Sequence, residues 1–374
     1  MTLNSSRTAL LVLCVLLTGL PAAAQKRCFT RETRAQAERS AKVWHDPDPG
    51  YDPVVGYNPT TGARTGAPPA DDNGLSLPLR CVANKDENPG SGTTPKFHCS
   101  VPGVIDKDGA PIRYKVKPHF KGQEKEKRNG EIYGEFLSSR FSQALGFFAD
   151  DEWVADVTCP DCEKSLTRGF QGTRFSPFQP AAGIELSLGR GLDANCDGKD
   201  SGSLEDSLEK LTKGGAPRAE IDAFKLWLAF IDHGDTKANN HRYACLNSTK
   251  IGDRELTCDE PVFYVSDMGS TWGYSSASEK KARLENWLGK DPLRVKDGHC
   301  TANAKSIGDA TISEAGRQLL AGGLQRLLDA EKSNQTITRV FRASRNQERD
   351  AAPEAWTAEF TRKANTIINA RCSN

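Results

Sequence analysis

Hydrophobic and polar positions follow two different periods along the chain, and the change of period divides it. In the run "IRYKVK", the apolar residues Ile112, Tyr114 and Val116 fall on one face and basic residues fall on the other. Such alternation is typical of a half-buried β-strand. Between residues 131 and 145, apolar residues recur at helical spacing instead, which predicts an amphipathic helix.

Helical spacing dominates the second half of the chain. The stretch "PRAEIDAFKLWLAFIDH" predicts a helix, and further amphipathic helices are expected at 313–330 and 355–369. A β interruption is expected near 243–266, and "EWVADVTC" predicts a strand after the first helix. A small β-rich part followed by a mostly helical part predicts an α+β fold.

The first 75 residues lack both periods. Residues 1–24 combine Arg7, an apolar run and a small-residue site at Ala22–Ala24, which predicts a cleaved signal peptide. That run is too short to span a bilayer, so we expect a secreted or periplasmic protein without a membrane span. Residues 25–75 become rich in Pro, Gly and Asp, which predicts an extended arm.

Cysteine usage agrees with export. The chain has 11 cysteines, and Cys14 lies within the predicted signal peptide. An even number therefore remains, which favours disulfides in an oxidising compartment. Two local pairs are expected at the ends of strand-turn-strand segments: Cys81 with Cys99, and Cys245 with Cys258.

Two short motifs have the spacing of metal ligands but are incomplete. Cys159 and Cys162 form a CxxC motif that would be half a zinc site, but no second Cys or His pair follows at suitable spacing. The loop at 193–205 begins like a calcium loop, but Leu204 occupies its twelfth position. We interpret this loop as surface structure, with calcium binding as the alternative.

The charge of the chain is balanced. Lys and Arg total 50, and Asp and Glu total 49. No basic stripe or acidic tail interrupts this balance, so the sequence gives no support for binding to nucleic acid or to a membrane surface.

The stretch "FIDHGDTKANNHRYACL" carries the first candidate site residues. It places Asp235, Lys237 and Asn240 on a loop after an apolar helix, and a downstream strand ends in "SDMG", which delivers Asp267. Asn240 and Asp267 are the kinds of side chain that hold Mg²⁺ or Mn²⁺. Asp235 is expected to orient an attacking hydroxyl and Lys237 to touch the transferred phosphate. Taken singly, each is also compatible with a polar turn or a cap.

The upstream half of the chain supplies the other groups that phosphoryl transfer needs. Lys117 is the strand lysine that would neutralise phosphate, with Lys115 as the second choice. Glu135 is the helix acid that would aim this lysine, with Glu131 as the second choice. The run "GSGTTPKF" is a candidate phosphate loop, with backbone and hydroxyl donors at Ser91, Gly92, Thr93 and Thr94.

These motifs together resemble the protein-kinase-like superfamily, nearest its HipA-type and phosphatidylinositol 3/4-kinase-like branch. The resemblance rests on "SGTTPKF", "YKVKP", "GEFLSSRFSQALGF", "HGDTKANN" and "SDMG", and it favours Lys117 and Glu135 over their alternatives. It implies a two-lobed fold, with a β-rich N-lobe at 76–150 and a mostly helical C-lobe at 151–374. The chain departs from the pattern in its long insertion between Asn240 and Asp267.

The resemblance also implies a function. It implies an ATP-dependent phosphotransferase that uses Mg²⁺ or Mn²⁺ and transfers the γ-phosphate to a protein or small-molecule hydroxyl. Kinase-like folds include members that only bind, so a non-catalytic pseudokinase module is the alternative. A third reading retains the nucleotide but transfers AMP or an amino acid.

Overall fold

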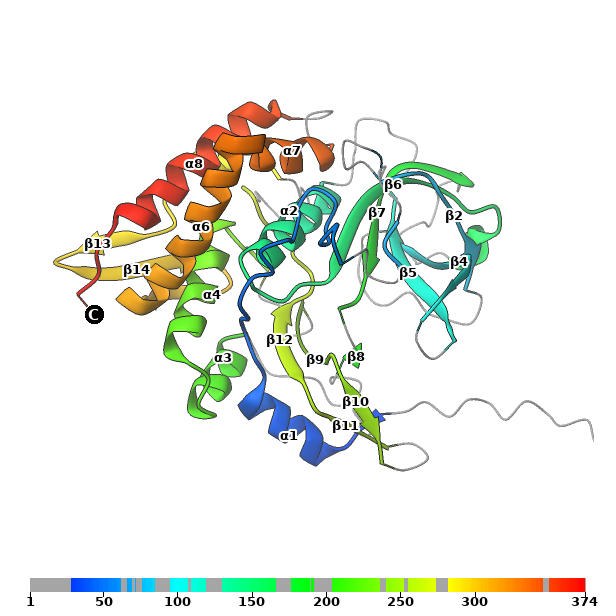
Figure 1. Ribbon diagram of the computed structural model, residues 1–374, viewed down its shortest axis with the longest axis horizontal. Coiled ribbons are helices and arrows are strands. Elements are labelled where there is room, and N and C mark those ends of the chain that lie inside the picture. Colours follow the sequence, from blue (N-terminus) through cyan, green and yellow to red (C-terminus); the bar gives the residue numbers. More distant parts are fainter. Residues whose placement is uncertain are drawn as a thin grey trace, which may run out of the picture.

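The computed structural model has an α+β architecture, with a β-rich sheet and a set of C-terminal helices (Figure 1). The structure describes residues 28–61, 66–68, 71, 76–84, 95–106, 109–118, 130–165, 176–188, 190–191, 204–235, 240–251, 255–273, 282–345 and 350–373. The predicted signal peptide at 1–24 lies outside these residues, and so does the calcium-like loop before Leu204.

A six-stranded sheet forms the β-rich part, with the strand order β2-β6-β7-β5-β4-β3. Its strands are β2 (Leu79–Arg80), β3 (Val82–Ala83), β4 (Phe97–Ile105), β5 (Pro111–Lys117), β6 (Asp151–Thr158) and β7 (Phe178–Leu186). The strands predicted from "IRYKVK" and "EWVADVTC" are confirmed as β5 and β6. β5 lies between β4 and β7, so it is an interior strand of the sheet.

The predicted helix over 131–145 is confirmed as α2 (Glu131–Ala144), which packs against β6 and β7. Its first twelve residues are all buried, although the sequence predicts only one apolar stripe. The reason is its position, since α2 lies between the sheet and the C-terminal helices (Figure 1). Trp227 and Trp272 reach it from the C-terminal side and donate to Ser142 and Ser138 at 2.8 and 2.9 Å.

From α3 (Leu204–Lys213) onward the chain is mostly helical, whereas β6 and β7, which lie beyond the predicted lobe boundary at residue 150, belong to the six-stranded sheet. The helices that follow α3 are α4 (Arg218–Phe230), α5 (Leu284–Leu288), α6 (Glu314–Asn334), α7 (Thr336–Ala343) and α8 (Pro353–Asn369). The strands beside them are β8 (Arg190–Gly191), β9 (His241–Cys245), β10 (Ser248–Lys250), β11 (Glu255–Cys258), β12 (Pro261–Val265), β13 (Arg294–Lys296), β14 (His299–Ala304) and β15 (Gly308–Thr311). β9 and β12 pair in antiparallel register, and this pair is the predicted β interruption.

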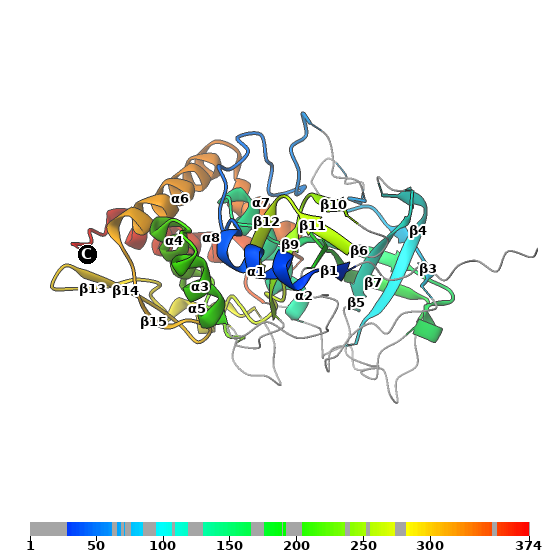
Figure 2. The same ribbon diagram turned by 90° about the horizontal axis from the view of Figure 1, so that it is seen from below.

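The N-terminal segment is not uniformly extended, so the prediction of an arm over 25–75 is wrong for its first part. β1 (Cys28–Phe29) pairs with β11, and α1 (Arg31–Ser40) is a helix whose N-cap, Thr30, accepts from the backbone of Thr33. α1 lies beside α3, where Lys210 bonds to Glu38 at 3.1 Å (Figure 2). Composition favours disorder there, but packing against a distant part of the chain overrides it.

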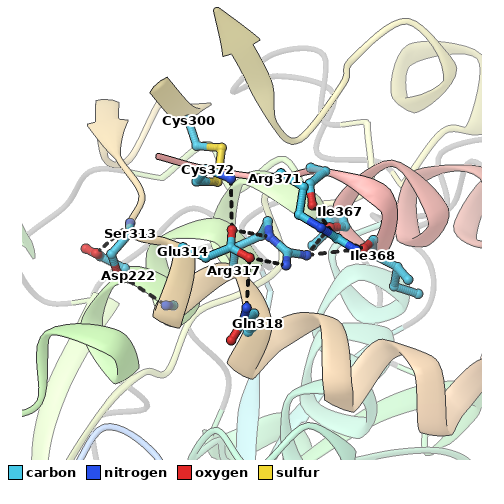
Figure 3. The surroundings of a disulfide bond; sticks show 12 residues. Asp222, Cys300, Ser313, Glu314, Arg317, Gln318, Ile367, Ile368, Arg371 and Cys372 are labelled. Carbon is cyan, nitrogen blue, oxygen red and sulfur yellow. Dashed lines mark hydrogen bonds and ion pairs between the residues drawn. A yellow bond between two sulfur atoms is a disulfide. The ribbon is translucent and has the colours of Figure 1, made fainter. Parts of the chain in front are cut away.

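Four disulfides join cysteines within the described residues. Cys81–Cys99 and Cys245–Cys258 confirm the two predicted pairs. The two cysteines of the CxxC motif at 159 and 162 bond to each other, so their sulfurs are not available as thiolate ligands for zinc. A fourth bridge, Cys300–Cys372, was not predicted; it ties β14 to the chain after α8 (Figure 3).

The disulfides fit a protein of an oxidising, extracytoplasmic compartment. In the part of the chain that the structure describes, no helix is both long and apolar enough to cross a bilayer.

Candidate active site

The last residue of β5 and the middle of α2 meet in a buried ion pair. The ammonium of Lys117 contacts the Glu135 carboxylate directly, and it lies 3.5 Å from Oε1 of Glu131. The side chains of Lys117 and Glu135 are only 3% and 2% exposed. Lys115, the alternative lysine, pairs with Glu185 of β7 instead. The structure therefore brings together the lysine and the acid that the sequence analysis places first.

Both faces of β5 are covered at its C-terminal end, which explains how Lys117 comes to be buried while Lys115 is half-buried. Ile112, Tyr114 and Val116 belong to the core on one side of the sheet. The opposite face carries Lys115 and Lys117, and Lys117 meets Glu131 and Glu135 of α2 there. A polar face of a strand is usually solvated, but here each lysine meets a carboxylate as it loses water, as a buried charge requires.

Asp267 lies beside the same ion pair. Carboxylate oxygens of Glu131, Glu135 and Asp267 all lie within 4.8 Å of one another. Two glycines permit this approach of the loop after β12 to α2. A Cβ on Gly269 would come within 2.1 Å of Glu131 Cγ, and a Cβ on Gly134 would come within 2.9 Å of the carbonyl oxygen of Gly269.

Asn240 and Asp267 flank the β9–β12 pair, so the strands hold them together. His241 is opposite Val265 in the register, and the N–H of Ser266 donates to the carbonyl oxygen of Asn240 at 2.8 Å. The Asn240 residue is 7% exposed, and its side-chain nitrogen has no hydrogen-bond partner within the described residues. The oxygen and nitrogen of an amide side chain are assigned from their hydrogen-bonding surroundings. The unpartnered end of this buried amide can therefore be its oxygen, and an oxygen in that position fits a metal ligand.

Asp235 follows α4 on a segment that is bonded to the same loop. The N–H of Gly234 donates to the carbonyl oxygen of Ser270 at 2.8 Å. Burial lowers the pKa of His233, while the nearby Asp267 and Asp235 act in the opposite direction. Both carboxylates therefore act electrostatically on the same buried imidazole.

Two groups of predicted site residues lie outside the described residues. These are Lys237 and the loop residues Ser91, Gly92, Thr93 and Thr94. Their predicted roles therefore remain predictions.

Lys96 is a further cation that the charges of this site act on, and the sequence analysis assigns no separate role to it. It is the seventh residue of the candidate phosphate loop "GSGTTPKF" and lies two residues after Thr94. Burial lowers its pKa, as does the charge of Lys117, while Glu131 and Asp267 raise it. The Pro-Lys-apolar end of this loop is the sequence feature that could have identified Lys96.

The electrostatics of the site favour a charged lysine. Burial alone would lower the pKa of Lys117, but Glu135 and Glu131 raise it well above the usual value. Burial raises the pKa of Glu135, and Lys117 acts against that rise. A site with buried ammonium groups beside several carboxylates is suited to an anion that arrives together with a divalent cation.

Comparisons with known proteins add one structural likeness. No family model matches the chain, and no curated protein matches it in sequence. Among solved structures, the crystal structure of a Helicobacter pylori proinflammatory kinase, CtkA, is similar with a TM-score of 0.38 and 10% sequence identity. The alignment covers 78% of this chain and 93% of that chain. The functional proposal therefore rests on the side chains described above.

Proposed function

We propose that the chain is a kinase-like phosphotransferase with a two-lobed fold. In this proposal it transfers the γ-phosphate of ATP to a hydroxyl group of a protein or small molecule, with Mg²⁺ or Mn²⁺. The observation that carries the proposal is the buried contact of Lys117 with Glu135, with Asp267 beside it. A strand lysine aimed by a helix acid, next to a metal-binding aspartate, is the arrangement that protein kinases use for phosphoryl transfer.

The pair has a defined role in this proposal. Lys117 would bind phosphate oxygens, and Glu135 would hold the ammonium in place. Binding of the nucleotide would require little rearrangement of this pair, because both side chains are already held in contact and shielded from water.

Asn240 and Asp267 would hold the metal ion. The unpartnered amide of Asn240 and the carboxylate of Asp267 offer the oxygen ligands that Mg²⁺ and Mn²⁺ prefer. When bound, the ion would neutralise negative charge on the phosphates.

Asp235 would orient the acceptor hydroxyl and accept its proton. Its place after α4, on the segment bonded to the Asp267 loop, supports this role. Lys237 would contact the transferred phosphate, and Ser91, Gly92, Thr93 and Thr94 would cover the phosphates. The four disulfides support an activity exerted after export, in a secreted or periplasmic setting.

The test is metal-dependent turnover of ATP by the purified, oxidised protein. Asp235→Ala and Asp267→Ala should each abolish turnover, whereas Asp329→Asn, an exposed change on α6, should leave it unchanged. ADP is the expected product. ATP binding without turnover would favour the non-catalytic alternative, and release of pyrophosphate or AMP would indicate transfer of AMP or an amino acid. Absence of both binding and turnover would contradict the proposal.

A further inference from the structure

Two glutamates face each other across the sheet beneath α2. Glu152 of β6 is directly opposite Glu185 of β7 in the antiparallel register, and Glu185 is in turn opposite Lys115 of β5. Side chains at such opposed positions lie about 4.5–5.5 Å apart at Cβ, and like charges there repel. Glu152 and Glu185 are 4% and 5% exposed, so water does not screen this repulsion.

The two lysines of β5 are already paired with other acids. Lys115 pairs with Glu185, and Lys117 pairs with Glu135. Carboxylate oxygens of Glu135, Glu152 and Glu185 all lie within 4.8 Å of one another, yet Oε1 of Glu152 has no hydrogen-bond partner within the described residues.

Arg140 is not an ion-pair partner of Glu152 within the described residues, although it also acts on Glu152 electrostatically. Its guanidinium lies over the rings of Phe136 and Trp153, at 5.0 and 5.5 Å from their centroids. Within the described part of the chain, Glu152 is thus a buried carboxyl group that has acidic neighbours and no cation of its own. An ionised carboxylate in such a place is strongly unfavourable.

We propose that Glu152 carries a proton at neutral pH and donates a hydrogen bond to a neighbouring carboxylate, which keeps Lys117 on Glu135. Glu152 is then a positioning residue behind the ion pair; its purpose rests on the proposed function, but its protonation does not. Burial raises the pKa of Glu152 well above the usual value, as do Glu135 and Glu185, while Lys117 and Lys115 act against the rise.

Ionisation of Glu152 would change the site in a defined way. The proton leaves to solvent, and a third carboxylate then competes for the two lysines. Lys117 is drawn from Glu135 toward the sheet, away from where the nucleotide phosphates are proposed to bind. ATP binding should therefore weaken as the pH rises through the ionisation of Glu152, and the neutral isostere in Glu152→Gln should remove this dependence.

The protonation is tested without nucleotide. The infrared spectrum of the native protein at pH 7 should contain the carbonyl band of buried carboxylic acid, and Glu152→Gln should reduce it. Any remaining band would come from Glu135 and Asp150, whose pKa values burial also raises. Because the native state binds a proton that the unfolded state releases, the equilibrium constant for unfolding should rise with pH above 4.5. In Glu152→Gln the equilibrium constant for unfolding should rise less steeply with pH. The two slopes should differ by at most about a factor of ten in this constant per pH unit. Glu255→Gln, an exposed change on β11, should alter neither result.

A second variant protects the test if Glu152→Gln folds poorly. In Glu185→Gln, Lys115 loses its partner and the opposed charge disappears, so Glu152 should ionise and the band should be reduced in the same way. The pH dependence of ATP binding in the presence of Mg²⁺, measured by calorimetry, then tests the positioning role.

The outcomes separate this inference from the proposed function. An unchanged band and an unchanged unfolding slope in Glu152→Gln would overturn the inference, whatever the protein binds. Equal pH dependence of ATP binding in wild type and Glu152→Gln would overturn the positioning role. If neither protein binds ATP while band and slope behave as expected, the proposed function fails and the protonated Glu152 stands.

Discussion

Gly134 on α2 and Gly269 after β12 lie so close that a Cβ on Gly134 would approach the carbonyl oxygen of Gly269 to 2.9 Å. The contact sets the distance between the helix that carries Glu135 and the loop that carries Asp267. A backbone carbonyl cannot turn aside as a flexible side chain can, so a larger residue at 134 must separate the two elements.

Gly134→Val should therefore weaken the binding of ATP with Mg²⁺ more than it weakens the fold. Overpacking of this kind costs about 1–3 kcal/mol of stability, which denaturant unfolding measures, while calorimetry measures nucleotide affinity. Gly322→Ala on α6 is the matched control, because a Cβ there meets nothing within 4 Å. It should stabilise the protein by about 0.4–1 kcal/mol. Unchanged affinity in Gly134→Val would contradict the role of this contact.

The Lys117–Glu135 pair should respond differently to single and double changes. Lys117→Met leaves a buried carboxylate without its cation and should cost about 3–5 kcal/mol. The double variant Lys117→Met/Glu135→Leu removes both charges and should recover most of that stability while remaining without turnover. Denaturant unfolding and an ATP turnover assay make the comparison. A double variant as unstable as the single variant would show that the ion pair is not the cause.

Removal of the Cys300–Cys372 bridge should destabilise the C-terminal part. The bridge spans 72 residues, so its loss frees a long loop in the unfolded chain. Cys300→Ser/Cys372→Ser should lose about 2–5 kcal/mol. Cys159→Ser/Cys162→Ser, which opens a bridge across only three residues, should lose less. Thermal unfolding under oxidising conditions measures both, and equal losses would contradict the loop-length argument.

Glu314 should make stability depend on acid pH. It accepts from Arg317, from the N–H of Cys372 and from Gln318, and these contacts lower its pKa from 4.5 to about 2 (Figure 3). A lowered native pKa means that the carboxylate contributes stability above pH 4.5 and loses it as the pH falls toward 2. Glu314→Gln should flatten this part of the stability curve, as measured by unfolding at each pH.

The matched control for Glu314 is Glu354→Gln. Glu354 also lies in the first turn of a helix, but its side chain is 65% exposed, and among the described residues it pairs with an exposed arginine. This variant should retain the acid dependence of the wild type. The same flattening in both variants would exclude a specific contribution from Glu314.

Local pattern alone determined several parts of this protein. The alternation in "IRYKVK" located β5, and the helical spacing after residue 131 located α2. The short strand-turn-strand spacings also identified Cys81–Cys99 and Cys245–Cys258. Such features depend on residues close together in the chain, whose periodicity reflects the face that must leave water. The order of acids, amides and lysines along the chain suggested the candidate site.

Tertiary structure decided the remainder. The helix α1 forms where composition predicts an arm, because it packs against α3. The bridge from Cys300 to Cys372 joins positions that no local spacing connects. Glu152 and Glu185 become neighbours only through the register of β6 and β7. Pairing of distant segments depends on the free energy of packing the whole chain, so burial, strand register and the charge balance around Lys117 are properties of the folded protein.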